Sequence, residues 1–205
     1  MKLVILDRFN AYGFRNVMAL RGDMPKDGSV SFNPDGYAHA NELVAYIRSK
    51  FPHFCIGCAG YPEKHPEAPT LEKDIENLKR KVDAGADFVT TQLFFDNSHY
   101  FRFVEKCGKM GIDKPIIAGL LPALSMKQLM NFKNMCSTDI PQALIDSIAS
   151  AGDDVAAQSA AGLEWAQRQI DELLSAKVPG IHLYILNRAE SALKLSEKFG
   201  RKSAN

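Results

Sequence analysis

The sequence predicts an α/β fold in which parallel strands alternate with helices, and a (β/α) barrel fits it better than an open doubly wound sheet. First, five short runs rich in β-branched and aromatic residues are separated by segments with helical periodicity. Strict alternation of this kind implies parallel strands joined by right-handed crossovers. Second, almost every run is followed by residues unusual in plain loops. The strand ends of a barrel all meet at one mouth, whereas a doubly wound sheet uses only those near its switch point.

The expected strands are short and each is followed by turn or polar residues. They cover residues 16–20, 54–59, 88–94, 115–120 and 180–186. The residues that follow them, and that we expect at the barrel mouth, include Arg21, Tyr61, His65, Gln92 and Arg188.

Helical patterns lie between these strands. Apolar residues from 71 to 82 recur at i, i+4, i+7 and i+11 and form one stripe along a helix. Ser125, with Gln128 three residues later, has the form of a capping box and is expected to begin a helix. Asp153 is expected to cap a long helix, and Asn187 to cap the last one.

The composition is that of an ordinary globular protein, and we expect residues 1–205 to form a single domain. Of 205 residues, 46% are hydrophobic and 24% charged, and 25 Lys+Arg against 24 Asp+Glu give a net charge of +1. Such a balance provides no broad basic surface for nucleic acid or an anionic membrane, so an anionic ligand must be bound by a local site.

The sequence shows neither a membrane-spanning nor an export pattern. No run reaches the roughly 18 to 20 apolar residues that a bilayer requires, and the apolar stretch at residues 1–7 is too short for a signal peptide. We therefore expect a cytoplasmic protein. Its four cysteines are too few for a disulfide scaffold and should be reduced.

Arg21-Gly22-Asp23 places a cation and a carboxylate at the end of the first strand, with a glycine that lets backbone approach a ligand. The simpler alternative is a local Arg–Asp ion pair. An adhesion tripeptide is disfavoured because the motif follows a buried strand in a chain with no export signal.

The loop at residues 61–67 contains two prolines, which stiffen it and hold Tyr61 and His65 in place. His65 is either a ligand-binding residue or a structural hydrogen-bonding one. The other histidines have no partner spacing and are interpreted as structural or surface residues. They are His39, His53, His99 and His182.

A polar stripe of Asp74, Asn77 and Lys81, with Arg80 adjacent, runs beside the apolar stripe of the same helix. Such a stripe is usually a solvated helix face. The alternative is a clamp for a phosphate or adenylate group near the barrel mouth, for which Arg80 and Lys81 supply donors. Spacing by itself favours the solvated face.

Cys55-Ile56-Gly57-Cys58 matches a C-x-x-C pattern but lies in an expected strand, where residues three apart point to opposite faces. We therefore expect no redox pair and no metal site. Cys107 and Cys136 are interpreted as helix or core residues. The sequence also lacks the P-loop, the G-x-S-x-G elbow and the G-x-G-x-x-G turn.

Five sequence blocks, in order, resemble methylenetetrahydrofolate reductase. They are residues 16–23 (NVMALRGD), 59–68 (AGYPEKHPEA), 78–86 (LKRKVDAGA), 91–96 (TQLFFD) and 186–190 (LNRAE). The resemblance implies a (β/α)8 TIM barrel with FAD at its mouth. It also implies hydride transfer from NADH or NADPH to 5,10-methylenetetrahydrofolate, giving 5-methyltetrahydrofolate for methionine synthesis. In this family the two substrates use one site in turn, and the flavin carries the redox chemistry.

The resemblance also implies roles for individual residues. Asp23 is expected beside the reactive flavin ring, as the catalytic residue, where it also faces the folate. The other FAD contacts would be Arg21, Gly22, Tyr37, Ala38, Tyr61, His65, Ala68, Asp74, Asn77, Arg80 and Lys81. This reverses the preference for a solvated face at the polar stripe. The folate contacts would be Asp23, Gln92, Gln128, Phe132 and Arg188. Amides suit the edge of a pterin, and a cation suits the glutamate tail.

One part of the family pattern has no match. Its first strand carries a Phe-Glu-Phe-Phe-Pro-Pro-like motif whose glutamate is the general acid, and two further strands supply a Thr and a His to the flavin site. Residues 1–11 are instead expected to form a helix that leads into the first strand of this chain. The expected fold is therefore an incomplete barrel of about five parallel strands whose terminal strands have unpaired edges.

Three functional hypotheses follow. The chain is a methylenetetrahydrofolate reductase, or a truncated non-catalytic remnant that binds flavin or folate, or, with the resemblance set aside, a barrel enzyme acting on another anionic substrate. The resemblance leaves the choice between NADH and NADPH open. Relatives form homo-oligomers, and folate is the small-molecule partner that it implies.

Overall fold

The computed structural model describes residues 2–22 and 36–196, in which five parallel strands form one curled sheet. The strand order is β1-β2-β3-β4-β5, and each strand pairs in parallel with the next. The strands are β1 (Asn16–Met18), β2 (Cys55–Gly60), β3 (Phe88–Thr91), β4 (Ile116–Leu120) and β5 (Ile181–Leu183). All five expected strands are present, although β1 and β5 end before the predicted residues 20 and 186, and the chain forms an incomplete barrel.

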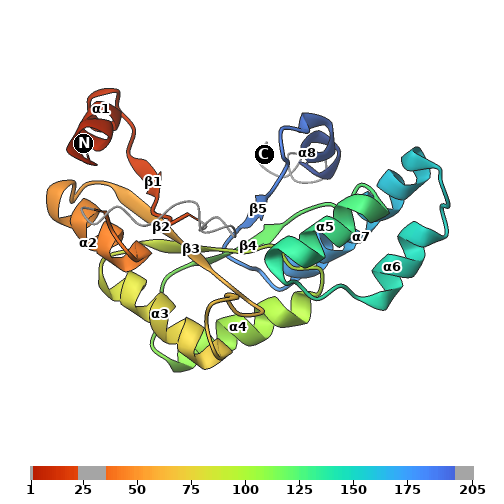
Figure 1. Cartoon of the computed structure of the whole chain (residues 1–205), viewed down its shortest axis with the longest axis horizontal. Coiled ribbons are helices and arrows are strands. Elements are labelled where there is room, and N and C mark those ends of the chain that lie inside the picture. The colour runs from red at the N-terminus through yellow and green to blue at the C-terminus, as the bar shows by residue number, and fades with distance from the viewer. Residues whose placement is uncertain (1, 23–35, 197–205) are drawn as a thin grey trace.

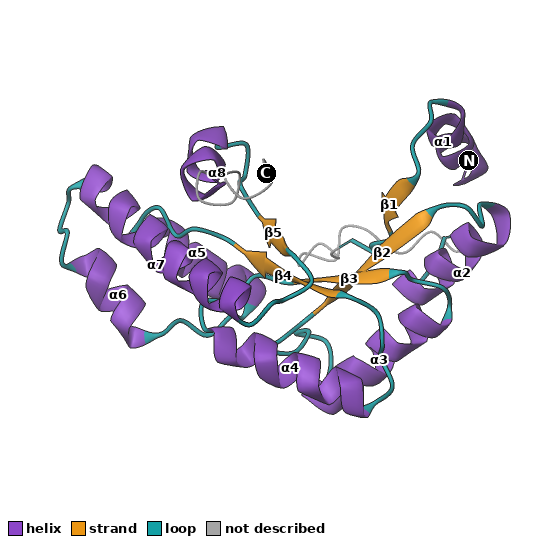
Figure 2. Cartoon of the chain, turned by 180° about the vertical axis from the view of Figure 1, so that it is seen from behind, coloured by secondary structure: helices purple, strands orange, loops and turns teal. Residues whose placement is uncertain are grey.

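Eight helices accompany these strands in the part of the chain that the structure describes. They are α1 (Lys2–Ala11), α2 (Ala40–Lys50), α3 (Leu71–Asp83), α4 (Asn97–Lys109), α5 (Met126–Cys136), α6 (Gln142–Ala149), α7 (Val155–Ser175) and α8 (Ala189–Ser196). Helices α2, α3 and α4 lie along the outer side of the curved sheet, and α5 to α7 continue that layer beyond β4 (Figure 1). Helices α1 and α8 stand on the opposite side, at the two ends of the sheet (Figure 2).

The main core lies between the sheet and its outer helices. Ile56, Val89 and Ala118 from the strands are fully buried there. The apolar stripe of α3 faces them, and Ile75 and Leu78 on that stripe are buried as predicted. Because α2 to α7 cover the outer face and α1 and α8 stand only at the two ends of the other side, the middle of the inner face and the strand ends are left to form a site.

The expected strand at 88–94 ends earlier than predicted, at Thr91. The Gln92 Oε1 atom accepts the Leu93 N–H at 3.0 Å. This backbone N–H is therefore bonded to a side chain and not to the backbone of an adjacent strand. The side chains of Leu93 and Phe95 pack into a second apolar cluster, together with residues of α5 and α6. The residues after β3 are thus a buried connection and not a continuation of the sheet.

Two of the three expected helix caps differ in the structure. Ser125 caps α5 as predicted, since its Oγ accepts the Gln128 N–H at 3.2 Å. The prediction for α7 is wrong by one residue, because Asp154 and not Asp153 accepts the N–H groups of the first turn. The prediction for Asn187 is also wrong. It adopts a left-handed backbone (φ 62°) two residues before α8 begins, whereas a capping residue is extended.

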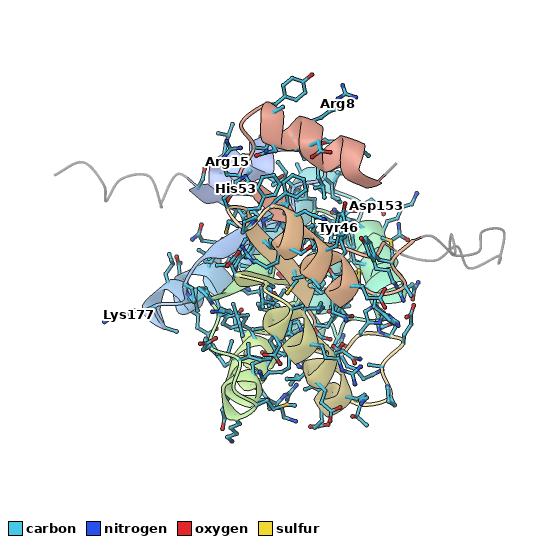
Figure 3. All side chains as sticks on the ribbon, turned by 90° about the vertical axis from the view of Figure 1, so that its left-hand side faces the viewer. Arg8, Arg15, Tyr46, His53, Asp153 and Lys177 are labelled. Atoms are coloured by element: carbon cyan, nitrogen blue, oxygen red, sulfur yellow. The ribbon has the colours of Figure 1, made fainter. Side chains whose placement is uncertain are left out.

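The N-terminal part of the chain confirms the expected helix before β1. Asn10, near the end of α1, receives contacts at its Oδ1 from His53 Nε2 at 2.8 Å and from Arg15 at 3.3 Å. Figure 3 shows Arg15 and His53 next to one another below this helix. Among the residues that the structure describes, β1 pairs with β2 alone and β5 with β4 alone, as expected for the ends of an incomplete barrel.

Candidate functional site

A cleft of about 1040 Å³ opens over the inner face of the sheet and the carboxyl ends of β1, β2 and β3. It gathers residues from four strands, two helices and the loops between them. The expected site residues that line it are Arg21, Gly22, Tyr61, His65, Ala68, Asp74, Asn77, Arg80, Lys81 and Gln92. Residues more than seventy positions apart in the sequence thus meet in one place.

Five expected site residues that the structure describes are not in the lining of this cleft. Asp23 lies outside the described residues. Tyr37 lines a second, apolar cavity of about 550 Å³ between α1, β1 and α2, where its ring lies 5.5 Å from that of Tyr46. The Ala38 N–H donates to Glu42 at the start of α2.

The other three are expected folate residues. Gln128 accepts the Leu124 N–H through its Oε1 at 2.8 Å, which holds the turn before α5. Phe132 is buried in the second apolar cluster, and Arg188 is exposed after β5. Gln128 and Phe132 lie on α5, which follows β4, and Arg188 follows β5.

The loop between β2 and α3 is braced from within. Lys64 adopts a left-handed backbone (φ 93°), and its Nζ donates to the carbonyl oxygens of Ala68 (2.6 Å) and His65 (3.1 Å). The His65 N–H donates to the Asp74 carboxylate at 3.0 Å. The loop is therefore fixed both by its own lysine and by the first turns of α3, as its two prolines led us to expect.

His65 stands edge-on to Tyr61, with the two ring centroids 4.6 Å apart. Its Nδ1 accepts the Glu67 N–H at 3.1 Å. In the neutral ring the proton therefore lies on Nε2, so that nitrogen acts as a donor. This arrangement fixes both the tautomer and the orientation of a side chain that lines the cleft.

Arg21, at the end of β1, forms a bidentate ion pair with Glu67 at 2.8 and 2.7 Å. The hydrogen bonds and charge of Arg21 hold the pKa of Glu67 below its usual range. The expected alternative was a local pair with Asp23, which lies outside the described residues. The pair with Glu67 instead links the end of β1 to the β2–α3 loop and holds the guanidinium at the cleft.

The polar stripe of α3 faces the cleft and not bulk solvent. Asp74 is buried, and this burial raises the pKa of its carboxyl group, against the opposing effects of the His65 N–H and the Lys81 ammonium. The Lys81 Nζ donates to the Ala59 carbonyl oxygen at 2.5 Å, and burial lowers the pKa of this lysine. Arg80 is exposed at the rim. The solvated-face interpretation is therefore wrong for Asp74 and Lys81.

The raised pKa of Asp74 predicts a pH dependence of stability. Since the folded protein disfavours ionisation of Asp74, stability is lost as pH rises from about 3.8, the usual Asp pKa, through the raised value. We expect Asp74→Asn to gain in unfolding free energy relative to the wild type across that range. Urea denaturation from pH 3 to 7 measures this. Glu76→Gln on the same helix is the control. Its pKa is lowered by Lys73, so its effect should have the opposite sign. A difference for Asp74→Asn that falls with pH would contradict the prediction.

Sequence reasoning missed several residues of the cleft, among them His39, His182 and Tyr184. The last two form a pair. Their rings are edge to face with centroids 4.6 Å apart, and the Tyr184 hydroxyl donates to the Thr91 carbonyl oxygen at 2.9 Å. The alternation of a strand places residues 182 and 184 on the same face. Because the strand was recognised, this alternation could have placed both side chains on the inner face.

Residues 2–22 and 36–196 contain neither a candidate metal-binding group nor a candidate membrane-spanning helix. There is no group of three or more His, Cys, Asp or Glu side chains suited to a metal ion. No helix in this part of the chain is long and apolar enough to cross a membrane. Cys58 and Cys107 are buried in the core, where burial raises the pKa of both thiols.

The family model described as methylenetetrahydrofolate reductase matches residues 3–200. The chain belongs to this family. It is 38% identical over 188 residues to the 5,10-methylenetetrahydrofolate reductase of Escherichia coli, covering 92% of this chain and 62% of that protein. It is 36% identical over 207 residues to methylenetetrahydrofolate reductase (NADH) 1 of Arabidopsis thaliana, covering 95% of this chain and 35% of that protein. The chain thus spans less than two thirds of the length of these methylenetetrahydrofolate reductases.

A solved structure shows the same fold at low sequence identity. It is an uncharacterized protein from Clostridium thermocellum, described as binding two copies of 5-methyl-5,6,7,8-tetrahydrofolic acid. The TM-score is 0.55 at 16% identity, over 78% of this chain and 59% of that one. This likeness supports the barrel-like α/β fold of the chain.

Proposed function

We propose that this chain acts in the reduction of 5,10-methylenetetrahydrofolate to 5-methyltetrahydrofolate, with FAD as cofactor and NADH or NADPH as reductant. The observation that carries the proposal is the strand-end cleft, which brings the motif residues of β1, β2, β3 and α3 together. Membership of the family supports the reaction, and the names of the relatives, which specify NADH or NADPH, support a nicotinamide reductant.

The residues of the cleft fit FAD. A volume of about 1040 Å³ accommodates a large ligand. Arg21 and Lys81 place cationic groups in the cleft, and Arg80 adds one at the rim, which suits a pyrophosphate. Asp74 and Asn77, on the same face of α3, suit the hydroxyl groups of a ribityl chain or ribose. When bound, FAD would supply hydride transfer between nucleotide and folate.

The chain's own residues would bind and orient the substrate. Gln92 lies in the cleft with its Oε1 occupied by the Leu93 N–H, so its NH₂ group is the end offered to an acceptor on a pterin ring. Asp23, two residues after Arg21, would lie beside the reactive part of the cofactor. A folate that extends from the cleft across the ends of β4 and β5 would reach Gln128, Phe132 and Arg188.

Flavin binding and electron transfer test this function directly. The purified chain is titrated with FAD, and NADH or NADPH oxidation is then followed with menadione or with methylenetetrahydrofolate as acceptor. We expect FAD binding and FAD-dependent menadione reduction. Turnover of methylenetetrahydrofolate should likewise require FAD, since the flavin would carry the hydride between nucleotide and folate. A folded chain that binds neither FAD nor folate would overturn the proposal.

A second candidate function is a non-catalytic flavin- or folate-binding protein. The fold neighbour from Clostridium thermocellum, which is described as binding 5-methyl-5,6,7,8-tetrahydrofolic acid, supports this candidate. The same measurements separate the two candidates. FAD and 5-methyltetrahydrofolate binding without any oxidation of NADH or NADPH would establish the binding protein, whereas electron transfer to menadione would exclude it.

A further inference from the structure

Glu63 joins the β2–α3 loop to a distant part of the chain. Its carboxylate accepts the Thr138 hydroxyl at 2.9 Å and the Asp139 N–H at 2.5 Å, across 75 and 76 sequence positions. Thr138 is buried, and both donors lie in the connection between α5 and α6. Glu63 does not line the cleft, and neither the family resemblance nor the comparisons give it a role.

The two ends of this link carry different parts of the proposed site. Glu63 lies midway between Tyr61 and His65, which line the cleft expected to hold the flavin. Thr138 follows Ser137, which ends α5 in a left-handed backbone (φ 53°). Helix α5 carries Gln128 and Phe132, the residues expected to contact folate. One carboxylate therefore connects the flavin side of the site to the folate side.

The hydrogen bonds of Glu63 matter more for the structure at the end of α5 than for the β2–α3 loop. The β2–α3 loop is also held by the Lys64 ammonium and by the Asp74 carboxylate, so it keeps its shape without Glu63. At the other end, loss of the Glu63 carboxylate removes the acceptor of the buried Thr138 hydroxyl and of the Asp139 N–H. Such a change disturbs the end of α5 more than the loop.

The surroundings of Glu63 favour a fixed arrangement. Burial raises the pKa of its carboxyl group, while the two hydrogen bonds and the nearby His99 oppose that effect. His99 Nε2 lies 3.7 Å from Asp139 Oδ2, and Arg102 contacts the other ring nitrogen at 2.5 Å. The charged or titratable groups around the link thus include His99, Arg102 and Asp139, and Asp96 interacts with the first two.

We propose that Glu63 is a positioning residue. It holds α5 at the distance from the β2–α3 loop that folate binding requires. This inference rests on the proposed function. It predicts that Glu63 acts on folate affinity and leaves flavin binding and the nucleotide half of the reaction almost unchanged.

The test uses Glu63→Ala and Glu63→Gln in the full chain. For Glu63→Ala we expect 5-methyltetrahydrofolate binding to weaken about tenfold, because two hydrogen bonds are lost. The FAD dissociation constant and the menadione rate should change by less than about twofold. Glu63→Gln keeps one acceptor oxygen and should weaken folate binding about threefold. This variant tests the role of Glu63 even if Glu63→Ala does not fold. Glu105→Ala is the control, since Glu105 forms an exposed pair with Lys109 on the outer side of α4.

Amide hydrogen exchange provides a readout that does not depend on any ligand. In Glu63→Ala, exchange should accelerate at Asp139 and in the last turn of α5, and remain unchanged in residues 61–68. Unchanged exchange in α5, or equal losses of FAD and folate affinity, would overturn the inference. A wild-type chain that binds neither ligand would contradict the proposed function, and the exchange experiment would still decide whether Glu63 positions α5.

Discussion

Replacing Gly162 with Ala should destabilise the protein by about 3 kcal/mol or more. A Cβ atom at this position of α7 would lie 1.6 Å from the Ala123 carbonyl oxygen and 2.6 Å from its carbon. These are backbone atoms of the connection between β4 and α5, so no change of rotamer relieves the clash. For a chain of this size we expect the melting temperature to fall by about 6 to 12 °C, measured by circular dichroism together with urea denaturation.

Gly108→Ala is the matched control for this substitution. Gly108 also lies within a helix, α4, but a Cβ atom there would have nothing within 4 Å. Alanine at that position should stabilise the protein by about 0.5 to 1 kcal/mol, because glycine is the weaker helix former. If the two variants lose stability equally, the close approach of α7 to Ala123 is wrong.

Replacing Lys81 with Met should weaken FAD binding by about a hundredfold. Lys81 donates to the Ala59 carbonyl oxygen and lies near the buried Asp74 carboxylate at the base of the cleft. Methionine keeps the length of the side chain and removes the charge. The cofactor then loses a charge-assisted contact of about 1.5 to 3 kcal/mol, and Asp74 loses its nearby cation. Fluorescence titration with FAD measures the change.

Lys79→Met is the control for the loss of a lysine from α3. Lys79 pairs with Asp83 on the partly exposed outer side of the helix, and such pairs contribute little to stability. We expect its FAD affinity to match that of the wild type. An FAD affinity of Lys81→Met within about threefold of the wild type would show that α3 does not hold the phosphate groups.

The strands and most helices could be predicted because their signals are local. Short apolar runs and a regular stripe at residues 71–82 determine the elements themselves. Boundaries were less predictable. Asp153 and Asp154 are adjacent and chemically equivalent, so only the direction in which the chain enters α7 decides that Asp154 is the cap. Likewise, Asn187 looks like a cap in the sequence, but the chain turns there with a left-handed backbone.

The lining of the cleft was predictable where motif residues follow strands, and the contacts within it were not predictable where partners are distant in the sequence. The pairing of Arg21 with Glu67 spans 46 positions, and no pattern in the sequence indicates it. The orientation of α5 also depends on tertiary contacts. Gln128 and Phe132 are predicted site residues, yet in the structure one holds a turn and the other packs into an apolar cluster.

The shortness of β1 has a consequence for how a ligand and the fold influence each other. This three-residue edge strand pairs with β2 alone within the described ranges, and its side chains are mostly exposed. Edge segments of this kind open more readily than the interior of a sheet. Arg21 lies three residues beyond β1, so any fraying of the strand withdraws the guanidinium from Glu67 and from the cleft. Affinity for an anionic ligand is then limited by the local unfolding equilibrium of β1, and a bound ligand stabilises β1 by the same free energy.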